Sequence, residues 1–218
     1  MTDQATARFN MIEQQIRTWE VLDPKVLATL NSIPRENFVP DAYRGLAFAD
    51  IEIPLPHDQQ MLSPKVEGRF LQALQLQATD KVLLIGAGSG YLAALMAQHA
   101  AQVTALEIFP DLCELASQNL SKQGIHNVQV IEADGHSGLE SNAPFDAIVF
   151  TASSPVEAEG VRRQLSIGGR MLIVLGKAPV MQATLIQRLA EHSYKQDVLF
   201  ETSLTEMQNA PQAQAFSF

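Results

Sequence analysis

Residues 82–91 have the sequence Val82-Leu83-Leu84-Ile85-Gly86-Ala87-Gly88-Ser89-Gly90-Tyr91. A short apolar run is followed by three glycines at alternate positions, and a helical pattern begins near Tyr91. Glycines let the backbone turn sharply and approach a ligand closely, and a helix N-terminus offers free N–H groups. The plainer interpretation is a structural turn between a strand and a helix, which many α/β proteins contain. We expect a ligand-binding loop.

From residue 80 onward, short apolar runs alternate with helical stretches. The expected strands cover residues 82–85, 103–106, 128–131, 147–150 and 171–174, and the expected helices cover 91–99, 112–123 and 156–165. Such alternation predicts an α/β fold with a parallel sheet and helices on both faces. Residues 183–189 and 195–204 have the pattern of two further strands. We therefore expect a doubly wound, mostly parallel, seven-stranded sheet closed by an antiparallel hairpin.

The first 80 residues have a helical and irregular pattern. Thr2-Asp3 could cap a first helix, and Asp23-Pro24 and Ser63-Pro64 each combine an N-cap residue with proline at the first helical position. The chain has 218 residues, which fits one domain because domains usually have roughly 100–200 residues. We expect a single domain made of an N-terminal helical extension (1–79), an α/β core (80–176) and C-terminal strands (177–218).

The net charge, the cysteine count and the hydropathy pattern argue against several classes of protein. The net charge is −9, from 15 Lys+Arg and 24 Asp+Glu, which argues against a general nucleic-acid binder. Cys113 is the single cysteine, so an internal disulfide and a Cys-rich zinc site are excluded, and the histidines lack metal-ligand spacing. Residues 82–106 carry no formal charge, but their glycines and polar residues argue against a membrane span. The N-terminus has no signal-peptide pattern, and we expect a cytoplasmic protein without a metal.

The spacing of the glycines narrows the choice of ligand. The dinucleotide fingerprint is G-x-G-x-x-G, and Tyr91 stands where its third glycine would be. A phosphate-binding P-loop needs a lysine that is absent after Gly90. The G-x-G-x-G spacing suits a nucleoside without a pyrophosphate, and S-adenosylmethionine is the common one.

Acidic residues at two further strand ends support a nucleoside site. Glu107 ends the second expected strand, 21 residues after Gly86, where a doubly wound fold offers an acid to ribose hydroxyls. Asp134 follows the third expected strand and could meet an adenine amino group. Each acid alone is more often a solvated charge at a strand end. Together, on successive strand ends of one sheet edge, they indicate a nucleoside site at the topological switch point.

Several segments outside the loop are more specific than the loop itself. Before it stand Arg8-Phe9-Asn10-Met11-Ile12-Glu13-Gln14-Gln15-Ile16, Ile33-Pro34-Arg35-Glu36-Asn37-Phe38-Val39-Pro40 and Gln59-Gln60-Met61-Leu62-Ser63-Pro64-Lys65. After it stand Ala133-Asp134-Gly135-His136-Ser137-Gly138, Ala143-Pro144-Phe145-Asp146 and Gln164-Leu165-Ser166-Ile167-Gly168-Gly169-Arg170. With these segments the chain resembles the protein-L-isoaspartate O-methyltransferase family along nearly its whole length. The resemblance implies a Rossmann-like, class I methyltransferase fold.

The resemblance also implies an activity and a set of partners. The enzyme would transfer a methyl group from S-adenosylmethionine to the abnormal α-carboxylate of an L-isoaspartyl residue, as a cytoplasmic protein-repair enzyme, and release S-adenosylhomocysteine. A carboxylate with an ordinary pKa of about 3.9 is already ionised at neutral pH, so the reaction needs no general base. The expected partners are isoaspartyl proteins or peptides, without nucleic acid or membrane, and the protein is expected to be a monomer or homodimer.

The expected site residues follow from the loop, the strand ends and the resemblance. Ser63 matches the family's active-site serine, although it could also be a plain N-cap before Pro64. We assign Met61, His57 and Glu201 to the substrate side and no residue to a metal. The expected cofactor-binding residues are Gly86, Ala87, Gly88, Ser89, Gly90, Glu107, Ile108, Asp134, Gly135 and Thr151.

Three positions depart from the family pattern. Leu84 stands where the family has an acid, Met61 replaces a threonine, and Glu201 lies in an altered C-terminal segment where it would repel a substrate carboxylate if it faced the site. These changes leave open a methyltransferase with another acceptor, or a non-catalytic module that binds the cofactor or a protein partner. An NAD-dependent oxidoreductase fits less well, because of Tyr91.

Overall fold

The computed structural model describes residues 4–212, a range that does not contain Thr2-Asp3. The core is a seven-stranded sheet with the order β5-β4-β3-β6-β7-β8-β9. Its strands are β3 (Lys81–Ile85), β4 (Gln102–Glu107), β5 (Val128–Glu132), β6 (Phe145–Ser154), β7 (Leu165–Lys177), β8 (Val180–Ala190) and β9 (Ser193–Glu201). The pairings among β3 to β7 are parallel, whereas β8 pairs antiparallel with β7 and with β9. The expected sheet and its closing hairpin are confirmed.

The strands alternate their side chains between two hydrophobic clusters. On β3, Val82 and Leu84 belong to the larger cluster, and Leu83 and Ile85 belong to the smaller one. Successive side chains of a strand point to opposite faces of a sheet, so each cluster covers one face. The larger cluster includes residues of α3 (Pro64–Leu74), α4 (Tyr91–Ala97) and α5 (Pro110–Lys122), whereas α6 (Glu159–Arg162) packs in the smaller one. Helices therefore cover the two faces unequally.

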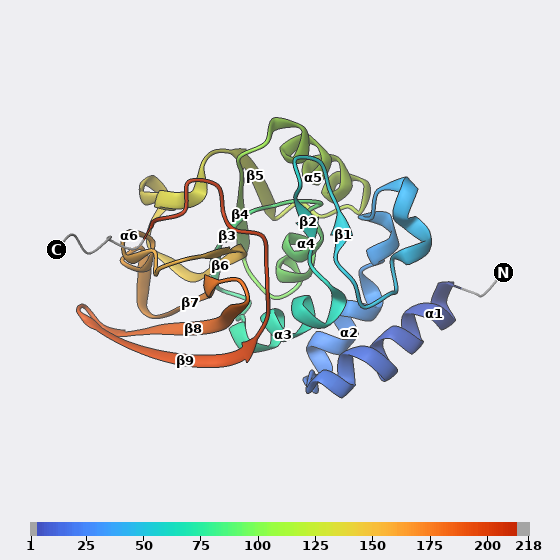
Figure 1. Ribbon diagram of the computed structural model, residues 1–218, viewed down its shortest axis with the longest axis horizontal. Helices are drawn as coiled ribbons and strands as arrows, with labels where there is room; N and C mark the ends of the chain where they lie inside the picture. Colours follow the sequence, from blue (N-terminus) through green and yellow to red (C-terminus); the bar gives the residue numbers. More distant parts are fainter. Residues whose placement is uncertain (1–3, 213–218) are drawn as a thin grey trace.

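The N-terminal region shares the larger cluster with the sheet. It consists of α1 (Gln4–Asn10), a π-helical turn (Met11–Ile16), a 3₁₀ turn (Arg17–Trp19), α2 (Pro24–Ser32), two more 3₁₀ turns (Arg35–Asn37 and Asp41–Leu46) and the short β1 (Ile53–Pro54) and β2 (Gln60–Met61). Ile16, Leu30 and Phe70 of α3 are almost fully buried in that cluster. Figure 1 shows α1 and α2 on one side of the molecule and the β8–β9 hairpin on the other.

One expected helix is wrong in its extent. Residues 156–165 were expected to be helical, but α6 covers only Glu159–Arg162, and β7 already begins at Leu165. Pro155 precedes the segment and Gly160 lies within it, and both residue types weaken a helix. The carbonyl oxygen of Gln164 accepts a hydrogen bond from the amide of Phe145, the first residue of β6. The chain at Gln164 therefore already pairs with the sheet.

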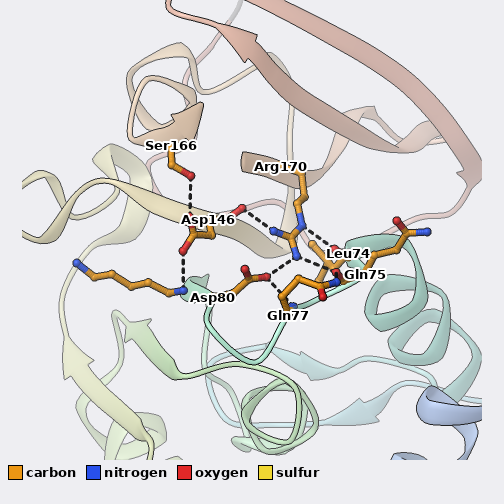
Figure 2. A network of polar contacts seen from close by, with 8 residues as sticks. Leu74, Gln75, Gln77, Asp80, Asp146, Ser166 and Arg170 are labelled. Atoms are coloured by element: carbon orange, nitrogen blue, oxygen red, sulfur yellow. Dashed lines mark hydrogen bonds and ion pairs between the residues drawn. The ribbon is translucent and has the colours of Figure 1, made fainter. Parts of the chain in front are cut away.

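A polar network holds the amino ends of the strands (Figure 2). The guanidinium of Arg170 on β7 donates to the carbonyl oxygens of Leu74, Gln75 and Asp146 at 2.6, 3.1 and 3.0 Å. It also forms an ion pair with Asp80 at 2.6 Å. The network connects the C-terminal end of α3 to the amino ends of the parallel strands, at the opposite end of the sheet from their carboxyl ends.

Candidate active site

A pocket lies at the carboxyl ends of four parallel strands. Its empty volume is about 750 Å³, part of it open to solvent. The strand order changes direction there, because β4 and β5 lie on one side of β3 and β6 lies on the other. Ligands bind at such switch points in open α/β sheets. The lining residues are Glu52, Leu55, Gln59, Gln60, Leu62, Ile85, Gly86, Gly88, Leu106, Glu107, Ile108, Phe109, Leu112, Ala133, Asp134, Gly135, Thr151, Ala152, Leu204, Thr205, Met207 and Gln208.

The glycine loop passes too close to its neighbours for larger residues. Gly86 has φ +92°, and a Cβ atom added to it would lie 2.1 Å from Oγ1 of Thr151. That hydroxyl donates to the carbonyl oxygens of Ile85 and Gly86, at 3.1 and 3.0 Å. Gly90 has φ +86°, and its Cβ would lie 3.1 Å from the carbonyl oxygen of Ala116. Both positions therefore require glycine for backbone conformation and for space.

Glu107 holds the glycine loop in place beside the pocket. It is 5% exposed, and its two carboxylate oxygens accept hydrogen bonds from the backbone amides of Gly88 at 2.8 Å and of Phe109 at 3.2 Å. Each carboxylate oxygen has two lone pairs. Glu107 can therefore hold the loop and still accept hydrogen bonds from two hydroxyl groups of a ligand.

Asp134 lies on the same edge of the sheet, after β5. Its carboxylate accepts from the backbone amide of His136 at 3.0 Å and from the side-chain amide of Asn209 at 2.7 Å. Partial burial raises the pKa of Asp134, but these two hydrogen bonds and the His136 side chain outweigh it, so the net pKa lies below the ordinary value. Asp134 is therefore ionised at neutral pH and able to accept from an amino group.

Ser63 lies at the start of α3, directly after Leu62, which lines the pocket. It occupies the N-cap position, but its side chain makes no capping hydrogen bond. Within the described residues, this hydroxyl therefore does not act as a plain helix cap. The residue before it, Leu62, lines the pocket, and its carbonyl oxygen accepts from the guanidinium of Arg35 at 2.7 Å.

Comparison with known proteins shows the family to which this chain belongs. The protein-L-isoaspartate(D-aspartate) O-methyltransferase family model matches residues 6–208 of the chain. The chain belongs to this family. Protein-L-isoaspartate O-methyltransferase 1 of Rhodopseudomonas palustris (strain HaA2) is 42% identical over 175 residues, which cover 80% of this chain and 71% of that protein. The enzyme named protein-L-isoaspartate O-methyltransferase in Aeropyrum pernix is 36% identical over 214 residues, covering 88% of this chain and 82% of that protein.

Two solved structures share the fold with this member of the isoaspartate methyltransferase family. One is named protein-L-isoaspartate O-methyltransferase, with a TM-score of 0.79 and 24% identity; the match covers 91% of this chain and 65% of that one. The other, from Plasmodium falciparum, was solved in complex with S-adenosyl-L-homocysteine. Its TM-score is 0.78 at 18% identity, and the match covers 95% of this chain and 99% of that one. The Rossmann-like methyltransferase fold expected from the sequence is confirmed.

The structure brings half of the expected site residues together. The seven that line the pocket are Gly86, Gly88, Glu107, Ile108, Asp134, Gly135 and Thr151. Ala87, Ser89 and Gly90 belong to the same loop but do not line the pocket. Met61 and Ser63 are buried beside it, on either side of the lining residue Leu62.

The remaining expected residues lie farther out. The imidazole of His57 stacks on Phe109, with ring centroids 4.2 Å apart, and its Nε2 is 2.8 Å from the Asp111 carboxylate. Glu201 lines a second, separate pocket together with Trp19, Lys65, Val66, Arg69, Phe200 and Thr202. Leu84 is fully buried in the larger cluster and does not line the pocket at the carboxyl ends of the strands. The substrate roles of His57 and Glu201 remain predictions.

Sequence reasoning missed two segments of the pocket wall. Gln59 and Gln60 come from the β1–β2 hairpin, and residues 204–208 come from the segment after β9. That C-terminal segment is held by Ser153, whose backbone amide donates to Thr205 and whose carbonyl oxygen accepts from Met207. No local sequence pattern predicts these hydrogen bonds of Ser153, because they join residues about fifty positions apart.

The charge of the pocket distinguishes between ligands. Three carboxylates line it, from Glu52, Glu107 and Asp134, and no lysine, arginine or histidine is among the described residues that line it. Burial raises the pKa of Glu52, and Lys65 partly opposes this. A pyrophosphate would be repelled by such a wall, whereas a sulfonium and an ammonium group would be attracted.

The described residues 4–212 contain no helix that is long and apolar enough to cross a membrane. Within that range, no group of three or more His, Cys, Asp or Glu side chains could hold a metal ion.

Proposed function

We propose that this protein is an S-adenosylmethionine-dependent carboxyl methyltransferase that acts on L-isoaspartyl residues of damaged proteins. The observation that carries the proposal is the carboxylate-lined pocket between the glycine loop and the Ser63 segment. The names of relatives that are 36% and 42% identical over most of the chain support this activity. They do not favour the alternative of another acceptor, nor that of a non-catalytic module.

The residues present fit the cofactor. Glu107 would accept the two ribose hydroxyls, Asp134 would accept from the adenine amino group, and the backbone at Gly86 and Gly88 would pass along the methionine part. Gly86 and Gly88 both line the pocket and carry no side chain, so a ligand could approach their backbone closely. When bound, S-adenosylmethionine supplies an electrophilic methyl group and leaves as S-adenosylhomocysteine.

The protein's own residues have to position the acceptor and exclude water. The isoaspartyl carboxylate is ionised at neutral pH, so no side chain needs to remove a proton. The hydroxyl of Ser63 makes no capping bond and would donate to an oxygen of that carboxylate, which orients the other oxygen toward the methyl group. Leu62, Leu204 and Met207 form apolar parts of the pocket wall and would keep water from the reacting atoms.

We further propose a cytoplasmic location, isoaspartyl proteins or peptides as partners, no nucleic acid partner, and a monomer or homodimer as the working form. The single cysteine, Cys113, leaves no internal disulfide, and the acidic net charge of −9 does not suit binding to nucleic-acid phosphates.

The experiment is methyl transfer from labelled S-adenosylmethionine to an isoaspartyl peptide, with its aspartyl twin as the control. The proposal expects base-labile label on the isoaspartyl peptide alone, and a strong loss of that label in Ser63→Ala. Label on neither peptide, with clear binding of S-adenosylhomocysteine, would overturn the acceptor but not the cofactor. In that case Met61→Thr and Leu84→Asp would test whether the departures from the family pattern altered the acceptor.

A further inference from the structure

Arg35 is the largest fully buried side chain in the described part of the chain, with 1% exposure. Its Nε donates to the carbonyl oxygen of Ala47 at 3.0 Å, its Nη2 donates to that of Leu62 at 2.7 Å, and its Nη1 pairs with Glu67. Its guanidinium also lies over the ring of Tyr91, 5.1 Å from the centroid. Each of its three nitrogens therefore donates to a partner, and the guanidinium also lies against an aromatic ring.

These partners flank the two segments that form the proposed site. Leu62 precedes Ser63, and Glu67 follows it by about one turn of α3. The carbonyl oxygen of Ser63 accepts from the amide of Glu67 at 3.1 Å. Tyr91 is the first residue of α4 and directly follows the glycine loop. One guanidinium thus touches the serine segment on both sides and the helix that ends the glycine loop.

We propose that Arg35 is a positioning residue for methyl transfer, which fixes the Ser63 segment relative to the glycine loop through the Leu62 carbonyl, Glu67 and the Tyr91 ring. This inference rests on the proposed function. A planar guanidinium presents donors in a rigid fork, so it sets the directions of several partners at once. Because a small misplacement of reacting groups costs much of the rate, this geometry bears on turnover.

Arg170 provides a matched control elsewhere in the fold. It is also a mostly buried arginine that bonds backbone carbonyls and pairs with an acid, Asp80 (Figure 2). Its network lies at the amino ends of the strands, whereas the pocket lies at their carboxyl ends. Loss of an arginine fork should destabilise the fold in both places, but only Arg35 should affect catalysis.

The first comparison is Arg35→Lys against Arg170→Lys. Lysine keeps the charge but cannot bond Ala47, Leu62 and Glu67 from one fork. We expect Arg35→Lys to lower kcat about 10- to 100-fold and to speed amide hydrogen exchange in residues 60–67, measured well below Tm. We expect Arg170→Lys to lower Tm while leaving kcat and that exchange unchanged. A kcat within about twofold of the parent for Arg35→Lys, or an equal loss in Arg170→Lys, would overturn the inference.

A second variant covers the case in which Arg35→Lys does not fold. Replacing a buried arginine and its carboxyl partner by apolar residues of similar size often preserves stability, so Arg35→Met combined with Glu67→Met should fold. The inference expects a low kcat with a Tm near that of the parent, and a parental kcat would refute it. A parent that does not methylate isoaspartyl peptide would overturn the proposed function. In that case the exchange rate of residues 60–67 tests, without turnover, only whether Arg35 fixes the Ser63 segment: faster exchange in Arg35→Lys supports that part of the inference, and unchanged exchange overturns it.

Discussion

Replacing Gly86 by alanine tests whether the glycine loop needs its observed path. The new Cβ would stand 2.1 Å from Oγ1 of Thr151, at a backbone φ of +92°. The backbone conformation costs roughly 1–2 kcal/mol for a residue with a Cβ. Thr151 must also rotate away from its two carbonyl partners, and a lost hydrogen bond costs about 1 kcal/mol.

The sum is about 2–4 kcal/mol. For a chain of this size, we expect Tm to fall by about 4–16 °C, at about 2–4 °C per kcal/mol. A loop that has moved to relieve the strain must return to its native path to hold the cofactor. Each 1.4 kcal/mol of that cost weakens binding about tenfold, so the full cost should raise the Kd for S-adenosylhomocysteine about 30- to 700-fold.

The assays are titration calorimetry with S-adenosylhomocysteine and thermal unfolding. Gly45→Ala is the matched control, because its Cβ would meet nothing within 4 Å and its φ is not positive. Thr151→Ala in the Gly86→Ala background removes the atom at 2.1 Å and leaves Cβ at 3.5 Å, so it should restore part of the binding. Parental affinity in Gly86→Ala, or no recovery in the double variant, would refute the steric reasoning.

Three further predictions concern individual carboxylates. Glu107→Ala should weaken S-adenosylhomocysteine binding about 10- to 100-fold, because bonds to a charged group contribute about 1.5–3 kcal/mol, whereas the exposed Glu114→Ala should leave calorimetric affinity unchanged. Burial raises the pKa of Glu67 from 4.5 to about 8, although its partner Arg35 acts to lower it. The contribution of Glu67 to stability is therefore complete below pH 4.5 and is lost as the pH rises to about 8. Glu67→Gln should flatten this fall of Tm with pH in thermal melts, and an unchanged pH profile would contradict the prediction. Asn209→Asp should place two carboxylates together at Asp134 and speed amide exchange in residues 204–210, and parental exchange rates there would count against the contact.

The fold could be predicted largely because its signals are local. Four apolar residues before Gly86 and the alternating strands and helices after it specify a parallel sheet without knowledge of tertiary contacts. The helix expected over 156–165 failed for a tertiary reason. Gln164 bonds to Phe145 and to Leu139. The bond to Phe145 places the next residues in β7, between β6 and β8, instead of in a longer helix.

The site could be predicted where it follows strand ends. Glu107 and Asp134 end neighbouring strands, so the parallel sheet alone brings them to one edge. The C-terminal segment 204–208 reaches the pocket only through its bonds to Ser153, and no periodicity shows this. Glu201 lines the second pocket beside Trp19, and its assignment to the substrate side stays a prediction.

A crystal structure of this protein with S-adenosylhomocysteine and an isoaspartyl peptide would locate the cofactor and the acceptor in one experiment. We expect the ribose hydroxyls at Glu107, the adenine amino group at Asp134, and the isoaspartyl carboxylate between the sulfur atom and Ser63. A nucleoside bound away from the glycine loop, or a peptide carboxylate out of reach of Ser63, would contradict this expectation.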